Sequence, residues 1–280
     1  MRWLVTVLTA ALVSAGIGHA PPDQARPDSP LVYKTPGMDQ VRVKRDLTYK
    51  KLASTEFQVD LFLPAAQGKQ APVVMLISGN SQPRKVFLGM EQMGRVLAAN
   101  GIAAVLFDKR YQRAGYYDAE QDMTDLTAFL HREADELGLD MSRVCHFGYS
   151  GGGPLLSIAL RPGSTARCVV GYYPMMDSDV WGAPADSRRD QAMRDFSPVQ
   201  QIAAGKGKTP PVFLVRAGID NPELLATIER FVRESIAQNA DLTFLNYPQG
   251  HHAFDIRDDN DQSRAVIKAT VEFLERQLNR

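Results

Sequence analysis

The sequence predicts an α/β fold in which helices cover both faces of a mainly parallel, doubly wound sheet, preceded by an antiparallel strand pair. Apolar runs of strand length alternate with amphipathic helical segments from residue 72 to the end of the chain. Several of these runs are continuously apolar, as is typical of parallel strands buried on both faces. The run at 57–63 instead alternates apolar and polar residues, which is typical of a half-buried strand.

The composition is that of a globular domain. The chain has 280 residues, of which 44% are hydrophobic and 23% are charged, and this mixture excludes a disordered or fibrous protein. Because 32 basic residues balance 32 acidic ones, the chain carries no basic field for nucleic acid and no polybasic membrane anchor. With no internal repeat and no linker, residues 41–280 are expected to form one domain.

The N-terminus has the features of a secretory signal peptide. Arg2 supplies a positive charge, residues 4–17 form an apolar run without charge, and small residues lead up to Ala20. The run is shorter than the ~20 residues that a membrane span needs, which disfavours a membrane anchor. We therefore expect a signal peptide over residues 1–20, a secreted or periplasmic mature protein without a membrane anchor, and an extended arm over 21–40.

After this arm, the first half of the chain is expected to hold five strands and two helices. An antiparallel pair comes first, with strands at 41–49 and 57–63 joined by a turn at 50–56. Then follow a strand at 73–77, a helix at 87–100, a strand at 102–107, a helix at 119–137 and a strand at 144–147. Gly101 and Gly138 come directly after the two helices, where glycine commonly ends a helix.

The second half continues the alternation and contains one insert. We expect a helix at 154–160, a strand at 168–173, a polar and irregular insert at 177–207, a strand at 212–215, a helix at 223–238, a strand at 242–247 and a helix at 263–278. Ser263 is the expected N-cap of the last helix. Because the insert follows a core strand, we expect it to line and limit a substrate pocket at the carboxyl edge of the sheet.

A G-x-S-x-G motif marks the expected nucleophile. Gly148-Tyr149-Ser150-Gly151-Gly152 directly follows a predicted strand and directly precedes a predicted helix, as a nucleophile elbow requires. The alternative is a glycine-rich turn without chemistry. We expect Ser150 to lie on a tight turn at the carboxyl edge of the sheet.

The partners of this serine are expected at the same edge. A serine hydroxyl needs an adjacent base, and His251 and His252 lie in the loop after the last strand. Asp220 follows the preceding strand, which gives the chain order Ser, Asp, His of this kind of triad. Asp177, after an earlier strand, is the alternative acid.

An oxyanion hole requires two preorganised N–H donors. The N–H of Gly151, the residue after the nucleophile, is the first expected donor. The second is expected from the Ser78-Gly79-Asn80 loop after the first core strand, with Asn80 preferred over Gly79.

These motifs resemble those of the α/β-hydrolase superfamily, most closely its dienelactone-hydrolase-like branch. Besides the elbow, the resemblance rests on three segments: Gly218-Ile219-Asp220, residues 247–254 and Asp108-Lys109-Arg110. In the family the catalytic histidine precedes a small residue and a phenylalanine, which implies that His252, before Ala253 and Phe254, is the base. The resemblance covers residues 41–278 and implies a triad of Ser150, Asp220 and His252, with no metal and no organic cofactor.

The chain departs from that branch in two places. Dienelactone hydrolases proper have a cysteine where this chain has Ser150, and the usual His-Gly of the oxyanion loop is Ser78-Gly79 here. The resemblance therefore implies a serine hydrolase without implying that the substrate is a lactone.

Three further groups of residues have two interpretations each. Cys145 and Cys168 are expected to be small core residues rather than a disulfide. The acidic loop at 255–261 is expected to be solvated rather than a calcium site. An aromatic cluster after a core strand either packs the insert onto the sheet or, with His251, forms a substrate pocket; its candidate pocket residues are Tyr172, Tyr173 and Trp181.

The expected function is that of a secreted serine hydrolase that cleaves a small-molecule carboxylic ester through an acyl-enzyme. A serine peptidase or amidase could use the same triad, although the chain has no propeller-sized N-terminal domain. A third hypothesis is a binding protein on a hydrolase scaffold that has lost its activity.

Overall fold

The computed structural model describes residues 28–66, 68–111, 115–178, 187–206 and 208–280. The predicted signal peptide and Trp181 lie outside the described residues, as does the first part of the predicted arm. Within the described ranges, no helix combines the length and the apolar character needed to cross a membrane.

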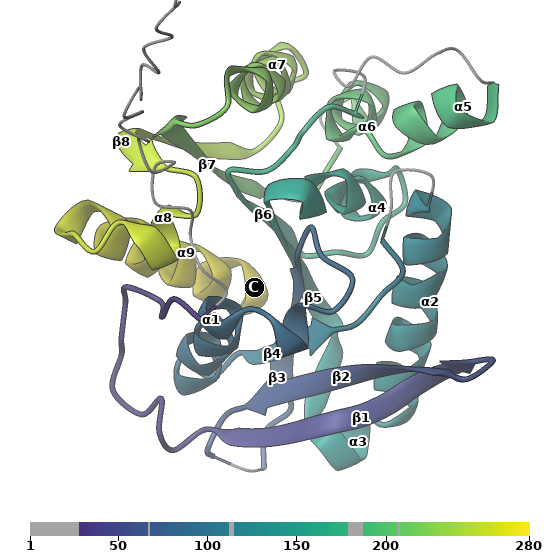
Figure 1. Cartoon of the computed structure of the whole chain (residues 1–280), viewed down its shortest axis with the longest axis vertical. Helices are drawn as coiled ribbons and strands as arrows, with labels where there is room; N and C mark the ends of the chain where they lie inside the picture. The colour runs from purple at the N-terminus through teal and green to yellow at the C-terminus, as the bar shows by residue number, and fades with distance from the viewer. Residues whose placement is uncertain (1–27, 67, 112–114, 179–186, 207) are drawn as a thin grey trace, which may run out of the picture.

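Within the described residues, eight strands form one sheet in the order β1-β2-β4-β3-β5-β6-β7-β8 (Figure 1). The strands are β1 (Arg42–Leu52), β2 (Thr55–Leu63), β3 (Ala71–Ile77), β4 (Ala103–Phe107), β5 (Leu139–Tyr149), β6 (Cys168–Tyr172), β7 (Val212–Ile219) and β8 (Leu242–His251). The pairs β1·β2 and β2·β4 are antiparallel, and the other neighbours are parallel. This arrangement confirms the predicted fold class.

Helices cover both faces of the sheet (Figure 1). They are η1 (Pro83–Lys85), α1 (Leu88–Ala99), α2 (Tyr116–Arg132), α3 (Ala134–Leu137), η2 (Ser150–Leu156), α4 (Ser157–Leu160), α5 (Ser187–Asp195), α6 (Pro198–Gly205), α7 (Pro222–Ala237), α8 (Phe254–Arg257) and α9 (Asp261–Leu278). One apolar core contains residues of α1 and α9, and a second contains residues of α2, α4, α6 and α7. Cys145 and Cys168 are paired neighbours on β5 and β6, and both are buried free thiols.

Several predicted element boundaries were wrong. Strand β1 continues to Leu52, and β2 already begins at Thr55. Only Ala53 and Ser54 therefore form the turn that was expected over 50–56. Strand β8 continues to His251, which therefore ends a strand rather than lying in a loop. These extensions come from cross-strand pairing, which adds polar residues to a strand that apolar periodicity alone would end earlier.

The last helix and the insert also differ from the prediction. The last helix begins at Asp261 because the Asn260 side chain, not that of Ser263, is its N-cap and accepts from the Ser263 N–H at 3.0 Å. The insert is not irregular, because its described residues form α5 and α6. The signal for α6 was Ser197 before Pro198, an N-cap residue followed by proline at the first helical position.

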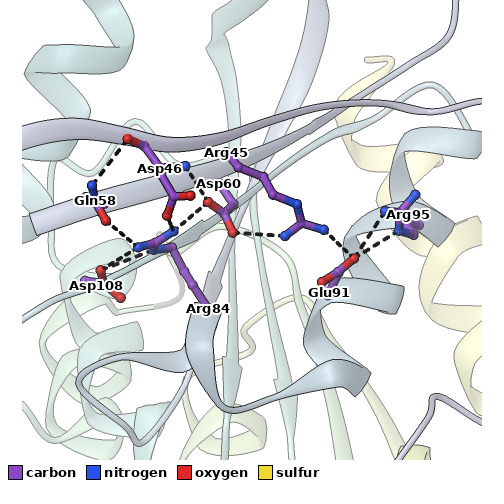
Figure 2. A network of polar contacts seen from close by, with 8 residues as sticks. All are labelled: Arg45, Asp46, Gln58, Asp60, Arg84, Glu91, Arg95 and Asp108. Atoms are coloured by element: carbon purple, nitrogen blue, oxygen red, sulfur yellow. Dashed lines mark hydrogen bonds and ion pairs between the residues drawn. The ribbon is translucent and has the colours of Figure 1, made fainter. Parts of the chain in front are cut away.

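An ion-pair network centred on the buried Arg84 ties the loop after β3 to the edge hairpin (Figure 2). The Arg84 guanidinium of η1 is 2% exposed and contacts Asp60 of β2 at 2.6 Å, Asp46 of β1 at 2.8 Å and Asp108 after β4 at 3.0 Å. Arg45, Glu91 and Arg95 extend the network from β1 to α1. Because breaking a buried pair costs about 3–5 kcal/mol, Arg84 holds this end of the loop firmly against three strands.

Candidate active site

Ser150 lies on the tight turn between β5 and η2. Its φ of 48° is in the left-handed region, which is strained for a residue other than glycine. The elbow packs against the loop after β3 so closely that both segments need a glycine where they touch. A Cβ atom on Gly152 would lie 2.2 Å from the Ile77 carbonyl oxygen, and one on Gly79 would lie 2.9 Å from the Gly151 Cα. The local geometry is therefore that of a nucleophile elbow.

His252 is paired with Asp220. The Nδ1 atom of His252 lies 2.7 Å from Oδ2 of Asp220, whose side chain is 4% exposed, whereas that of His252 is 38% exposed. The pair forms because Ile219 and His251 are register partners on β7 and β8, and Asp220 and His252 follow them in the chain. With Nδ1 facing the carboxylate, Nε2 is the ring nitrogen that can serve a nucleophile.

The structure separates the two neighbouring histidines by their partners. His251 donates its backbone N–H to Asp258 Oδ2 at 2.8 Å, and its Nδ1 lies 2.9 Å from Asp258 Oδ1. His251 is thus held by the loop that follows it, while His252 faces Asp220. The structure does not bring His251 into the cavity beside Ser150, where it was a candidate pocket residue.

Asp177, the alternative acid, has other partners. Its Oδ1 accepts from the Ser197 hydroxyl at 3.1 Å, and its Oδ2 lies 3.0 Å from Arg230. These contacts join the strand end after β6 to α6 and α7, away from His252.

The acidic loop is only partly solvated, which corrects the prediction. Asp255 is buried, and Asp258 binds His251, while Asp259 and Asp261 pair with Arg264. Among the described residues, no three His, Cys, Asp or Glu side chains come together in a way that could hold a metal ion.

A cavity of about 360 Å³ opens beside Ser150 and His252. Its walls come from the loop after β3, the start of α1, the elbow and the start of α8. The lining residues are Ser78, Gly79, Asn80, Phe87, Gly89, Met90, Tyr149, Ser150, Gly151, Tyr173, His252, Ala253, Asp255 and Ile256. Its size and largely apolar walls suit a small organic molecule.

Of the aromatic residues predicted to line a pocket, the structure brings Tyr173 to the cavity. The Tyr173 ring lies 4.6 Å from that of His252, measured between ring centroids. Tyr172 lies behind this wall, with its hydroxyl 2.7 Å from Thr270 Oγ1 of α9. Trp181 belongs to the residues that the structure does not describe.

The described part of the insert packs elsewhere. Phe196 and Ile202 belong to the core on the α2, α4 and α7 side of the sheet, and the Phe196 ring lies 5.2 Å from that of Tyr116. The cavity residues Met90 and Tyr149 belong to the core on the other side. The described residues of the insert do not line the cavity, whose outer walls come instead from α1 and α8.

The Ser78-Gly79-Asn80 loop, from which an oxyanion donor was expected, is held from behind by Lys109, which was not a predicted site residue. The buried Lys109 donates from Nζ to the main-chain carbonyls of Ser78 at 2.8 Å and Asn80 at 2.7 Å. Burial lowers the pKa of the Lys109 ammonium to about 7. The only sequence signal for this lysine is the family resemblance of the Asp108-Lys109-Arg110 segment.

The two expected oxyanion donors differ in their contacts. Asn80 already donates its N–H to Ser78 Oγ at 3.1 Å, so it would have to exchange this contact to bind an oxyanion. Gly151 is fixed through its carbonyl, which accepts from the Tyr111 hydroxyl. Lys109 and Tyr111, both just after β4, thus contact the two segments that would supply the donors.

Comparison with known proteins agrees with this architecture. The BD-FAE family model matches residues 59–167, which include the elbow. None of the curated proteins matches the chain. Among solved structures, the propionate-bound esterase Est2 of the planctomycete Thermogutta terrifontis superposes with a TM-score of 0.69 at 20% identity, over 86% of this chain and 96% of that one.

Two more esterases have the same architecture. A truncated carbohydrate esterase from gut microbiota superposes with a TM-score of 0.68 at 17% identity, over 90% of this chain and all of that one (100%). A double mutant of the esterase rPPE superposes with a TM-score of 0.66 at 19% identity, over 88% of this chain and 85% of that one. The strand order and these likenesses together show that the chain has the α/β-hydrolase fold.

Proposed function

We propose that this protein is a serine hydrolase that cleaves carboxylic esters through an acyl-enzyme. The observation that carries the proposal is the pairing of His252 with Asp220 at the cavity that also contains Ser150. A hydroxyl on an elbow, an imidazole and a buried carboxylate are the three groups that acyl transfer to serine requires.

In the proposed reaction, Ser150 Oγ attacks the ester carbonyl while His252 Nε2 takes the serine proton and passes it to the leaving alcohol. Water then hydrolyses the acyl-enzyme by the reverse proton movements. Asp220 holds the imidazole in one tautomer and stabilises its cation. Gly151 and the 78–80 loop would donate N–H groups to the oxyanion, with Lys109 holding that loop in place.

The comparisons support this proposal and a short acyl group. The proteins of similar fold are described as esterases, and Est2 has been observed with propionate and with butyrate bound. Est2 also becomes phosphorylated by paraoxon. A cavity of about 360 Å³ has room for acyl groups of this size. The likeness to dienelactone-hydrolase-like enzymes remains a prediction that rests on the motifs.

The test is a panel of p-nitrophenyl esters assayed beside aminoacyl amides, together with labelling by a fluorophosphonate. We expect ester turnover that exceeds amide turnover, and a label on the parent protein that is absent from Ser150→Ala. Faster cleavage of the amides would favour the peptidase hypothesis. Absence of both turnover and label would favour a binding protein on this scaffold.

Export is a separate part of the proposal. The charge at Arg2, the apolar run and the small residues before Ala20 support a cleavable signal peptide. We expect N-terminal sequencing to show that the protein recovered from outside the cytoplasm begins at Pro21. A protein that keeps residues 1–20 and stays with the cytoplasmic fraction would contradict it.

A further inference from the structure

The inner wall of the cavity beside Ser150 includes two buried polar side chains to which neither the proposed triad nor the proposed oxyanion loop assigns a role. They are Asp255 of α8 and Tyr149 of β5, which are 4% and 5% exposed. The neighbouring walls include the apolar side chains of Phe87, Met90 and Ile256, so these two groups are among the few polar ones on a mainly apolar surface. Polar groups placed singly in an apolar pocket usually orient a ligand.

Asp255 is a buried carboxyl group with a tyrosine donor. The Tyr173 hydroxyl donates to Asp255 Oδ1 at 2.5 Å. Burial raises the pKa of Asp255 to about 6, and His252 and Asp258 are the other charged or titratable groups that act on it. Near neutral pH the group is therefore a carboxylate that can accept a further hydrogen bond.

Tyr149 differs from the two tyrosines that surround it. The hydroxyl of Tyr172 is held by Thr270, and that of Tyr173 is held by Asp255. The hydroxyl of Tyr149 is buried and has no hydrogen-bond partner among the described residues. Burial, together with the charge of Asp255, raises the pKa of Tyr149, so this hydroxyl stays protonated. The Tyr149 ring lies 6.4 Å, between centroids, from the ring of Tyr173, whose hydroxyl bonds Asp255. An unpaired buried donor lowers the stability of the folded protein. A bound ligand that supplies a hydrogen-bond acceptor would remove this cost.

A ligand group that binds both side chains must accept from Tyr149 and donate to Asp255. An alkyl group does neither, a carboxylate is repelled by Asp255, and an ammonium group leaves the Tyr149 donor unpaired. A hydroxyl group satisfies both. We propose that the cavity recognises a hydroxyl group on the substrate, held between Tyr149 and Asp255, and so prefers hydroxylated esters. This inference rests on the proposed esterase function, and a water molecule would take the hydroxyl's place in the free protein.

Two matched pairs of esters test the preference and show which part of the substrate carries the hydroxyl. Methyl β-hydroxybutyrate and methyl isovalerate differ by a hydroxyl or a methyl group in the acyl part. Ethylene glycol monobutyrate and propyl butyrate differ in the same way in the alcohol part. We expect kcat/KM to be about tenfold higher for the hydroxylated member of one pair, after correction for the rates of hydrolysis by hydroxide.

Tyr149→Phe is the decisive variant, and Tyr172→Phe is its matched control. Tyr149→Phe is expected to bring the ratio for the preferred pair close to one while the midpoint of thermal unfolding stays unchanged or rises, because the variant removes an unpaired buried group. Tyr172→Phe is expected to keep the ratio and to lower the unfolding midpoint, because it breaks the bond to Thr270. A ratio near one for both pairs in the parent protein, or a ratio that Tyr149→Phe leaves intact, would overturn the inference.

Binding to the Ser150→Ala variant separates this inference from the proposed function. That variant cannot form an acyl-enzyme, so calorimetry can compare the affinities of the intact esters within each pair. Tighter binding of the hydroxylated ester, lost on adding Tyr149→Phe, would support the hydroxyl site even in a protein without esterase activity. Rapid hydrolysis of plain esters combined with equal affinities would leave the esterase proposal standing and contradict the hydroxyl site.

Discussion

The Nζ atom of Lys109 lies 2.7 Å from the main-chain carbonyl oxygen of Asn80, in the loop that faces the nucleophile elbow. A second bond from the same ammonium group reaches the Ser78 carbonyl at 2.8 Å. Burying a lysine is costly, and the two bonds to the loop carbonyls offset part of that cost. The same bonds fix the loop that we propose presents an N–H group to the developing oxyanion.

Replacing Lys109 is therefore expected to affect the rate more than substrate binding. Lys109→Met removes both donors and should lower kcat for p-nitrophenyl butyrate by roughly 10- to 100-fold with KM little changed. Lys85→Met, at an exposed position of η1, is the control and should behave as the parent. Equal kcat values for parent and Lys109→Met, in a protein that stays folded, would remove Lys109 from the oxyanion site.

The two neighbouring histidines are expected to differ sharply. His252→Ala removes the imidazole that faces Asp220 and should reduce kcat by on the order of 10⁴ or more. His251→Ala breaks only the contact with Asp258 and should reduce it by less than about tenfold. Steady-state kinetics of both variants on one ester decide the matter, and a reversed order of severity would assign the base to His251.

Substitutions of Ser150 are expected to abolish ester turnover, and glycine at this position is expected to be more stable than alanine. Ser150→Ala should lose ester turnover, by on the order of 10⁴ or more, and remain folded. Because φ is 48° at this position, Ser150→Gly should unfold with a free energy about 1 kcal/mol higher than Ser150→Ala. Urea unfolding of the two inactive variants measures the difference. A Ser150→Ala protein that keeps a tenth of the parental activity would exclude Ser150 as the nucleophile.

The buried Asp255 is expected to make stability depend on pH. Its folded pKa of about 6 lies above the ordinary value of 3.8, so between these pH values the folded protein holds a proton that the unfolded chain has released. Raising the pH from 4 to 6 therefore lowers the free energy of unfolding by roughly 2–3 kcal/mol through this group. Asp255→Asn has no carboxyl group to titrate, so its free energy of unfolding should not fall in this way between pH 4 and 6. The difference in stability between Asp255→Asn and the parent should therefore shift in favour of the variant up to about pH 6 and stay constant above it.

Urea unfolding at several pH values provides this measurement. Asp259→Asn, whose side chain is 80% exposed, is the control and should follow the parental curve. Parallel curves for the parent and Asp255→Asn would show that the carboxyl group is not held in its protonated form by burial.

The acyl-chain profile is expected to depend on α8 and not on the described part of the insert. Ile256→Ala enlarges the cavity and should shift the best p-nitrophenyl ester towards longer chains. Each methylene group changes discrimination by only about 1–3 kcal/mol, so the shift should be graded. Ile236→Ala, at a side chain of α7 that is 72% exposed, should leave the profile unchanged. An unchanged profile for Ile256→Ala would place the acyl group elsewhere.

Local patterns were sufficient to predict the sheet and the elbow. The continuous apolar runs at β3, β4 and β6 can be accommodated only where both faces of a sheet are covered, so the fold class follows from them. The elbow around Ser150 is also local, since a strand, a glycine-rich turn and a helix follow one another within a few residues. Asp220 could be placed because the carboxyl ends of parallel strands meet at one edge.

The surroundings of the elbow could not be predicted from local patterns, because they depend on contacts between segments far apart in the chain. Lys109 and Asp255 are charged residues that a sequence places on the surface, because burying a charge is costly unless distant partners compensate for it. Those partners, Ser78 for Lys109 and Tyr173 for Asp255, are far away in the chain and meet them only after the sheet has formed. Likewise, the break in the strand–helix alternation after β6 was enough to predict an insert, whereas packing of Phe196 against Tyr116 places its described part on the side of the sheet away from the cavity.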